Sequence, residues 1–264
     1  MDLQIKSKTA FISGSTQGIG FAIAETLLAE GANVIINGRT TLKVEEAVAL
    51  LKKKFPESSI QGFAADLSVG EQVEDLLKQL PAVEILINNA GMFQLKPFFE
   101  LTDPDWQQIF EINVLGGIRL TRALMPGMLK KNWGRIVFIS SEAGINVPEH
   151  MIHYGLTKTA LLSLSNGLAK MTRNTHVTVN TIVGGPTYSD GVATAIHHLA
   201  EEQQQSVEVI KQHIMNSMNP TSLIGRFIEP SEIASLTGYL CSPAAAAING
   251  ASLRVDGGIL TGIN

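Results

Sequence analysis

The sequence has one cysteine, no long apolar run and no excess of positive charge. Because Cys241 has no partner for an intrachain disulfide, the cysteine content fits a reducing compartment. No stretch approaches the roughly 18 apolar residues of a membrane span, and residues 1–8 lack the apolar core of a signal peptide. We therefore expect a cytoplasmic protein with no membrane contact, in which Cys241 is a small packing residue.

The charge balance argues against a nucleic-acid or lipid partner. Only 17% of the residues are charged and the formal net charge is −4, so no basic surface is indicated. Small molecules and further copies of the chain remain as partners. With 264 residues, 45% of them apolar, the chain can bury a full core, and it shows no linker or internal repeat. We expect a single domain over residues 1–264.

Short β-rich apolar runs alternate with helical patterns along nearly the whole chain. Several runs, such as residues 34–36 and 136–139, are apolar without alternation, which is typical of strands covered on both faces of a parallel sheet. The alternation predicts an α/β fold, a doubly wound, Rossmann-type parallel sheet of about seven strands. The expected strands are residues 9–13, 33–37, 60–64, 84–88, 135–140, 176–182 and 252–255. The expected helices are residues 18–30, 42–54, 69–79, 104–130, 151–171 and 230–240.

A glycine-rich turn follows the first predicted strand and opens the first predicted helix. It reads Gly14-Ser15-Thr16-Gln17-Gly18-Ile19-Gly20, with the spacing Gly-x-x-x-Gly-x-Gly. A turn in this position lets the backbone approach a pyrophosphate, while the helix N-terminus offers free N–H groups and a positive dipole end. We expect Gly14, Ser15, Gln17, Gly18, Ile19 and Gly20 to bind a dinucleotide.

A tyrosine and a lysine four residues apart form the most informative pattern. Tyr154 and Lys158 fall in a predicted helix, where residues four apart share a face. A tyrosine hydroxyl has a pKa near 10 and is a poor acid or base at neutral pH unless a cation stabilises its anion. Lys158 is in position to supply that cation. Ser141 directly follows the fifth predicted strand, thirteen residues before Tyr154.

These motifs together resemble the classical short-chain dehydrogenase/reductase family over residues 5–260. The resemblance implies that Tyr154 is the general acid/base, that Ser141 stabilises the substrate oxygen, and that Lys158 also binds the nicotinamide ribose. Asn113 matches the family's asparagine, which holds a water in a proton relay. Further cofactor contacts implied by the family are Asp66 and Leu67 at the adenine, with helix capping as the alternative for Asp66, and Asn89, Ala90 and Gly91 after the fourth strand.

The end of the second predicted strand bears on cofactor choice. An acidic residue there binds the ribose 2′-hydroxyl of NAD, whereas a basic residue accommodates the 2′-phosphate of NADP. In the family pattern Gly38 occupies the place of the NAD-selecting aspartate, and Arg39 follows it. We expect NADP(H) to be favoured, with NAD(H) possible, because Gln17 stands where many NADP-dependent members carry a second basic residue and Arg39 could be a solvated loop charge.

After the sixth predicted strand the chain departs from simple alternation. Gly185, Thr187 and Ser189 match family positions near the nicotinamide, although Gly184 replaces the usual proline. Residues 189–225 predict one or two amphipathic helices, which we interpret as a lid over an apolar substrate pocket. His150 and His153 flank the tyrosine without a cluster of carboxylates or cysteines, so we expect no metal.

The expected activity is the interconversion of a carbonyl and a secondary alcohol with a nicotinamide cofactor. One alternative is a 3-oxoacyl thioester (acyl carrier protein) reductase, which shares every motif named above. A different class of alternative is a non-catalytic dinucleotide sensor, but a pure binder has no chemical need for Asn113, Ser141, Tyr154 and Lys158 together. The resemblance also implies a homo-oligomer, commonly a homotetramer.

Overall fold

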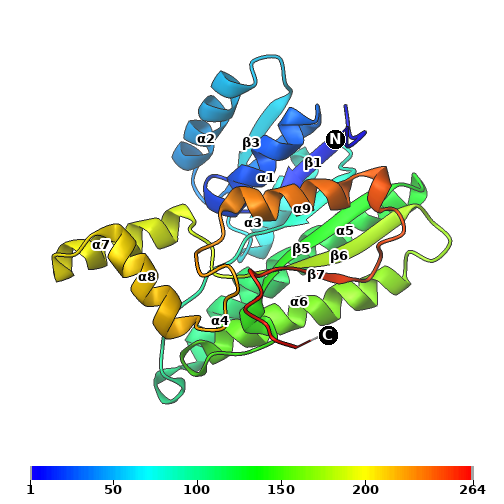
Figure 1. Ribbon diagram of the computed structural model, residues 1–264. Helices are drawn as coiled ribbons and strands as arrows, with labels where there is room; N and C mark the ends of the chain where they lie inside the picture. The colour runs from blue at the N-terminus through cyan, green and yellow to red at the C-terminus, as the bar shows by residue number, and fades with distance from the viewer. Residues whose placement is uncertain (1, 263–264) are drawn as a thin grey trace.

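The computed structural model describes residues 2–262, which form one seven-stranded parallel sheet in the order β3-β2-β1-β4-β5-β6-β7 (Figure 1). The predicted doubly wound sheet is thereby confirmed. Its strands are β1 (Thr9–Ile12), β2 (Asn33–Gly38), β3 (Ile60–Ala64), β4 (Ile85–Asn88), β5 (Gly134–Ser141), β6 (Val177–Gly184) and β7 (Ser252–Val255). The order reverses between β1 and β4, and ligands of such sheets bind at this switch point, beyond the carboxyl ends of the strands.

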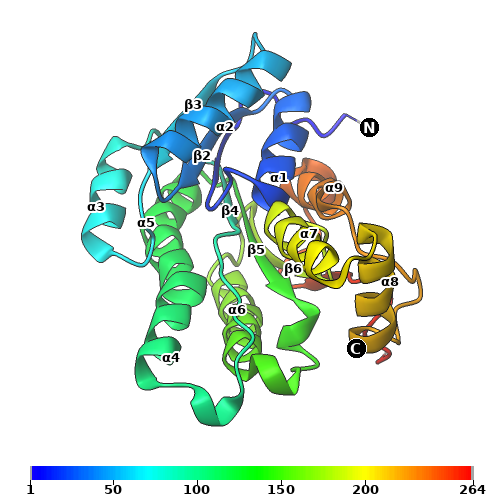
Figure 2. The same cartoon turned by 90° about the vertical axis from the view of Figure 1, so that its left-hand side faces the viewer.

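Helices cover both faces of the sheet. One face carries α1 (Gly18–Ala29), α2 (Thr41–Lys54) and α9 (Pro230–Cys241), and the other carries α3 (Gly70–Gln79), α5 (Gly116–Lys130) and α6 (Ile152–Lys170). Figure 2 shows the sheet separating α3 and α5 from α1 and α9. Each face of the sheet has its own hydrophobic core: the first core lies under α1, α2 and α9, and the second under α3, α5 and α6. In β1, Ile12 packs in the first core and its neighbour Phe11 in the second, so the side chains on both faces of the strand are buried. This explains why the strand sequences are apolar without alternation.

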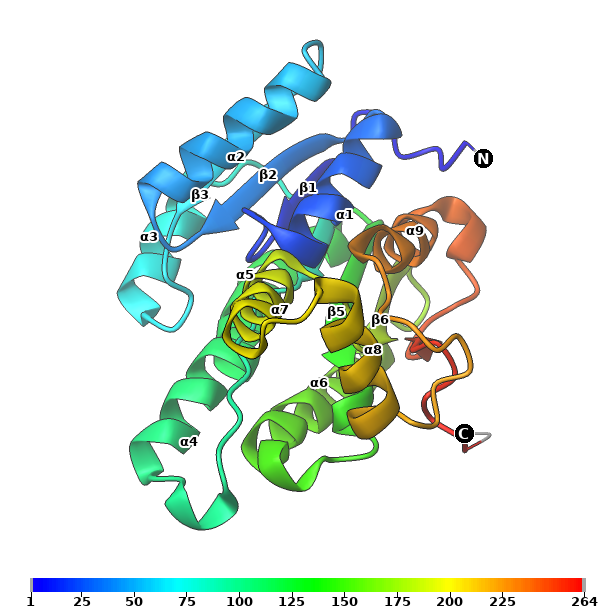
Figure 3. The ribbon, with the colours of Figure 1, turned by 60° about the vertical axis from the view of Figure 1, so that its left-hand side comes forward.

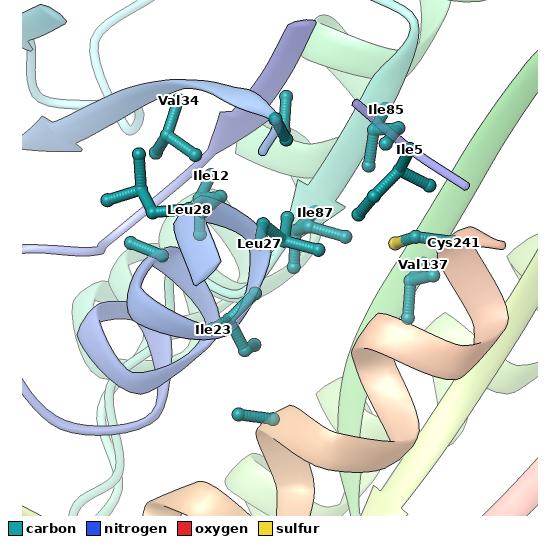
Figure 4. Packing of buried hydrophobic residues seen from close by; sticks show 14 of the residues in the cluster. Ile5, Ile12, Ile23, Leu27, Leu28, Val34, Ile85, Ile87, Val137 and Cys241 are labelled. Atoms are coloured by element: carbon teal, nitrogen blue, oxygen red, sulfur yellow. The ribbon is translucent and has the colours of Figure 1, made fainter. Parts of the chain in front are cut away.

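The first core joins α1 and α9 to the middle of the sheet. Ile23 and Leu27 of α1 pack near Ile12 of β1, and Cys241 of α9 lies beside Val137 of β5 (Figure 4). Cys241 is fully buried, which confirms it as a packing residue, and burial raises the pKa of its thiol to about 12.

Residues 103–130 are helical throughout, as expected, but the helix contains a π-helical turn that was not predicted. The segment consists of α4 (Asp103–Phe110), a π-helical turn η2 (Glu111–Leu115) and α5. Thr102 begins α4 with a capping box, because its hydroxyl accepts from the N–H of Asp105 while the Asp105 carboxylate accepts from the N–H of Thr102. Single π-helical turns occur frequently at functional sites, and this one contains Asn113.

The segment expected to be one or two helices contains two. α7 (Asp190–Gln203) and α8 (Val207–Met218) project from one end of the sheet in Figures 1 and 3. They share a small apolar cluster that is separate from the two main cores: Ile196, Ala200, Ile210, Met215 and Phe227. The remaining short helical turns are η1 (Phe98–Glu100), η3 (Glu142–Gly144), η4 (Glu149–Met151) and η5 (Pro243–Ala245). Among the described helices, none is both long and apolar enough to cross a membrane.

Candidate active site

Two neighbouring cavities lie at the carboxyl ends of the strands. The first, of about 420 Å³, is lined by Ser141, Tyr154 and Lys158 among others, and we call it the tyrosine cavity. The second, of about 380 Å³, is lined by Arg39 and Asp66 among others, and we call it the arginine cavity. They share a set of lining residues: Gly14, Gln17, Asn89, Gly91 and Met92. One elongated ligand can therefore occupy both.

The glycine turn between β1 and α1 forms part of both cavity walls. Gly14 and Gly18 have φ of +59° and +60°, a conformation that disfavours other residues. A Cβ on Gly14 would lie 2.8 Å from Ala90 Cα, and one on Gly20 only 2.5 Å from the Gly14 carbonyl oxygen. Gly20 is needed for packing of the turn against itself, and it lines neither cavity.

The first turn of α1 presents main-chain N–H groups. Gln17 precedes the helix without a side-chain cap, and the first N–H groups of a helix have no partners within it. One of them, the N–H of Gly18, donates to Asp190 Oδ2 at 2.6 Å. Ser15 does not belong to this surface: its buried hydroxyl donates to Ile12 O at 2.6 Å and accepts from Asn37 N. Its side chain therefore joins β1 to β2, away from both cavities.

The chain after β4 closes over the same turn. Asn89 Nδ2 donates to the carbonyls of Ser13 and Gly14 at 3.0 and 2.8 Å. The neighbouring Asn88 instead donates to Thr121 Oγ1 of α5. Asn89 and Gly91 line both cavities, and Ala90 lines the arginine cavity.

The arginine cavity contains two cations. Arg39 is exposed at the end of β2, and Lys43 lies on the same wall. Lys43 was missed from the sequence because a lysine in an exposed helical position has no distinguishing pattern. At Gly38 an added Cβ would lie 2.5 Å from Thr16 Cγ2, so an aspartate fits there only if the Thr16 side chain moves. Asp66 and Leu67 also line this cavity.

The Asp66 side chain makes a local turn. Its Oδ1 accepts from the N–H and the hydroxyl of Ser68 at 3.0 and 2.7 Å. The aspartate does not cap α3, since Val69 occupies the N-cap position.

The tyrosine cavity brings together the side chains expected from strand β5 and helix α6. Lys158 Nζ lies 5.5 Å from the centre of the Tyr154 ring and donates to Ile139 O at 3.0 Å. Ser140 is turned away and donates to the main-chain oxygen of Lys158. Ser141 faces the cavity, where its Oγ accepts from the N–H of Ala143 at 3.1 Å.

The electrostatics differ from the sequence expectation. Burial lowers the pKa of Lys158 to about 8, opposed by the nearby Glu142 carboxylate. Burial also raises the pKa of Tyr154 above its usual value, and Glu142 adds to the rise while Ser141 opposes it. The expected lowering of the tyrosine pKa by Lys158 is not found. Tyr154 is therefore neutral and carries the proton that reduction of a carbonyl requires, although the raised pKa makes this proton harder to transfer.

Asn113 lies behind this group and lines neither cavity. Its Nδ2 donates to Met92 O and Thr157 Oγ1 at 2.9 and 3.0 Å, and its Oδ1 accepts from Met92 N at 2.8 Å. Both donors are used, while Oδ1 keeps one acceptor position. The side chain fixes the loop after β4 against α6, and its role in a water relay stays a prediction.

Glu142 is a cavity residue that the sequence analysis missed. It follows Ser141 in η3, lines the tyrosine cavity and lies 2.6 Å from Ser141 Oγ through Oε2. Its position in the sequence could have indicated a place in the site, because Glu142 directly follows a serine at the end of a central strand. Asp190 was missed for another reason: its contact with Gly18 joins residues 172 positions apart.

The loop after β6 closes the tyrosine cavity. Gly185, Thr187 and Ser189 all line it. A Cβ on Gly185 would lie 2.8 Å from Asp256 Cα, and Thr187 Oγ1 donates to Gly185 O at 2.9 Å. A parallel bridge from Thr187 to Ile228 further fixes the loop.

His153 is buried within the protein rather than in the site. Its ring packs edge-on against Trp106 of α4, with centroids 6.0 Å apart, and burial lowers its pKa. Within residues 2–262, no three histidine, cysteine or acidic side chains come together as a group that could hold a metal ion.

A parallel sheet with this strand order, a glycine turn at the switch point and a Ser, Tyr and Lys group define a dinucleotide-dependent oxidoreductase. Residues 8–200 match the family model for short chain dehydrogenases, and the chain belongs to this family. It is 42% identical to the uncharacterised oxidoreductase YvaG of Bacillus subtilis, over the whole of both chains.

Two further comparisons bear on chemistry. The chain is 28% identical to the 3-oxoacyl-[acyl-carrier-protein] reductase FabG of Aquifex aeolicus, covering 98% of this chain and all of that one. Among solved structures it resembles L-sorbose reductase from Gluconobacter frateurii in complex with NADPH and L-sorbose. There the TM-score is 0.94 at 30% identity, with both chains covered completely.

Proposed function

We propose that the protein is an NADPH-preferring carbonyl reductase that converts a ketone to a secondary alcohol. The observation that carries the proposal is the convergence of Ser141, Tyr154 and Lys158 in one cavity that shares a wall with a second, cationic cavity. The similarity to a sorbose reductase bound to NADPH supports a ketone substrate and this cofactor.

The residues present fit a nicotinamide dinucleotide. Gly14 and Gln17 of the glycine turn line both cavities, Gly18 lines the tyrosine cavity, and the N-terminus of α1 has no side-chain cap, which is the arrangement that binds a diphosphate. Arg39 and Lys43 would hold a 2′-phosphate, and Asp66 with Leu67 would border the adenine. Gly185, Thr187 and Ser189 would border the nicotinamide end in the tyrosine cavity.

The mechanism assigns one task to each side chain. The bound cofactor supplies the hydride that reaches the carbonyl carbon. Ser141 donates a hydrogen bond to the carbonyl oxygen and stabilises the charge that develops there. Tyr154 transfers its hydroxyl proton to that oxygen, which becomes the alcohol, and Lys158 stabilises the tyrosinate that remains.

A second candidate is a 3-oxoacyl thioester reductase, favoured by the similarity to FabG. It uses the same residues and differs only in the group attached to the ketone. The two are distinguished by comparing a free ketone with an acetoacetyl thioester as substrate. We further propose, from the family resemblance, that the protein is a homotetramer in the cytoplasm and that α7 and α8 act as a substrate lid.

The test is NADPH oxidation in a panel of ketones with purified wild type and Tyr154→Phe. We expect Tyr154→Phe to lower kcat by about 10²- to 10⁴-fold while cofactor binding is retained. Tyr239→Phe, a change at a tyrosine of α9 that lines neither cavity, is the matched control. A wild-type protein that binds NADPH but reduces no carbonyl would favour the sensor instead.

A further inference from the structure

The Ser141 hydroxyl is held in a way that conflicts with its proposed task. Its Oγ accepts the N–H of Ala143 at 3.1 Å and lies 2.6 Å from Glu142 Oε2. A serine hydroxyl has a single proton to donate. When Glu142 is ionised, that proton goes to the carboxylate, so it is not available to a substrate carbonyl.

Glu142 cannot simply be left without a partner. The carboxyl is partly buried in the tyrosine cavity, and burial raises its pKa, opposed by the hydrogen bond with Ser141. A buried polar group that loses its hydrogen bond is costly, so Ser141 turns to a substrate readily only if something replaces it at Glu142.

We propose that Glu142 is a specificity-determining residue that selects α-hydroxy ketones by accepting a hydrogen bond from the hydroxyl next to the reacting carbonyl. This inference rests on the proposed reductase function and names its substrate class. The incoming hydroxyl replaces Ser141 as the donor to Glu142, and the released Ser141 proton turns to the carbonyl oxygen. The geometry fits this exchange, because two oxygens on adjacent substrate carbons meet two protein oxygens only 2.6 Å apart.

Near Ser141 and Glu142, the other residues that line the tyrosine cavity do not offer a second carboxylate that could accept the substrate hydroxyl. Tyr154 is assigned to the carbonyl oxygen, and Phe93 packs edge-on against its ring with centroids 6.4 Å apart. Asp190 also lines the cavity, but its Oδ2 is bonded to the N–H of Gly18. Glu142 is therefore the carboxylate adjacent to the proposed reaction centre.

The experiment compares two substrate pairs that are matched in size. Hydroxyacetone against 2-butanone exchanges a hydroxyl for a methyl group, and methoxyacetone against 2-pentanone exchanges an ether oxygen for a methylene. The second pair keeps the electron-withdrawing oxygen but lacks the donor, so it corrects for electronic activation of the carbonyl. The readout is kcat/KM for NADPH oxidation, and the selectivity is the first ratio divided by the second.

We expect wild type to show a selectivity of at least about tenfold, the lower range for one hydrogen bond to a charged group. Glu142→Leu removes the acceptor and should bring the ratio close to one. Glu142→Gln keeps a neutral acceptor of the same shape and should give an intermediate value, and it serves if Glu142→Leu does not fold. Glu57→Gln, an exposed change between α2 and β3, should match wild type.

The outcomes separate this inference from the proposed function. Equal selectivity in wild type, Glu142→Gln and Glu142→Leu would overturn the inference, even though the ketones are reduced. A wild type that prefers 2-butanone over hydroxyacetone would overturn it as well. If no ketone is reduced while NADPH still binds, the proposed function fails first and the inference fails with it.

Discussion

Asp190, the first residue of α7, accepts a hydrogen bond from the N–H of Gly18, the first residue of α1, across 2.6 Å. The carboxylate thus occupies one donor of the helix N-terminus that we assign to the cofactor diphosphate. It also connects α7 to the glycine turn. Cofactor binding and the position of α7 should therefore influence each other through this contact.

Removal of the Asp190 charge should strengthen cofactor binding. A negative carboxylate beside a bound diphosphate opposes it, and charges at a helix N-terminus contribute about 0.3–1 kcal/mol. Asp190→Asn should lower the dissociation constant of NADPH by about two- to fivefold, measured by quenching of tryptophan fluorescence. Glu201→Gln, an exposed change on the same helix, is the control. Weaker binding by Asp190→Asn would show that the carboxylate supports the bound state instead.

The fold could be predicted from the sequence because its determinants are local. Runs such as residues 34–36 are apolar on both faces of the sheet, and a glycine-rich turn marks the passage from β1 to α1. The π-helical turn between α4 and α5 could not be predicted in this way. Gly116 packs so closely that a Cβ would lie 3.0 Å from Leu67 Cβ, a contact between distant segments that leaves no periodic pattern.

Arg39 and Lys43 should together determine preference for NADPH over NADH. Both line the arginine cavity, and each supplies a positive charge for a 2′-phosphate. Arg39→Ala should weaken NADPH binding by about tenfold and leave NADH binding nearly unchanged. Lys43→Ala should act in the same direction but less strongly, because Lys43 also pairs with Glu46 at 3.4 Å.

Lys52→Ala, at an exposed position of the same helix α2, is the matched control. Titration with both cofactors at two salt concentrations is the measurement. An equal loss for NADPH and NADH in Arg39→Ala would contradict recognition of the 2′-phosphate.

Lys158 should limit activity at alkaline pH. Its pKa is about 8, so the ammonium is present below that pH and is lost as the pH rises through it. We expect kcat/KM for reduction to fall above pH 8. Because the Glu142 carboxylate raises the pKa of Lys158, Glu142→Gln should move this fall to lower pH. The measurement is kcat/KM from pH 6 to 10 for wild type, Glu142→Gln and the control Glu57→Gln. If kcat/KM falls at the same pH in Glu142→Gln as in wild type, Glu142 does not raise the pKa of Lys158.

The candidate site was predictable only where a family resemblance covered it. The resemblance implied Tyr154 and Lys158, which lie four residues apart on one helix, and Ser141, which ends a strand. Glu142 and Asp190 were not predicted, because neither the side-chain contact of Glu142 with Ser141 nor the long-range contact of Asp190 with Gly18 leaves a pattern in the sequence. Ser15 lies within the glycine turn in sequence, yet its hydroxyl bonds Ile12 and Asn37 beneath it.

Gly38→Asp, the substitution that would favour NADH, should destabilise the protein. An aspartate there would accept from the ribose 2′-hydroxyl and repel a 2′-phosphate, but its Cβ would lie 2.5 Å from Thr16 Cγ2. Gly38→Asp alone should therefore lose about 1–3 kcal/mol of stability by overpacking and bind both cofactors poorly. Thr16→Ala removes Cγ2 and makes room. The double variant Thr16→Ala/Gly38→Asp should recover stability and prefer NADH.

Wild type, the two single variants and the double variant are compared. Thermal unfolding measures the effect on stability, and titration with NADPH and NADH measures the effect on cofactor preference. Thr16→Ala alone should still prefer NADPH, because Arg39 and Lys43 remain in the arginine cavity. If Gly38→Asp melts at the wild-type temperature, Thr16 yields by rotation and the packing argument is wrong. If the double variant is stable but still prefers NADPH, the two cations outweigh the added carboxylate, and cofactor choice rests on Arg39 and Lys43 rather than on Gly38.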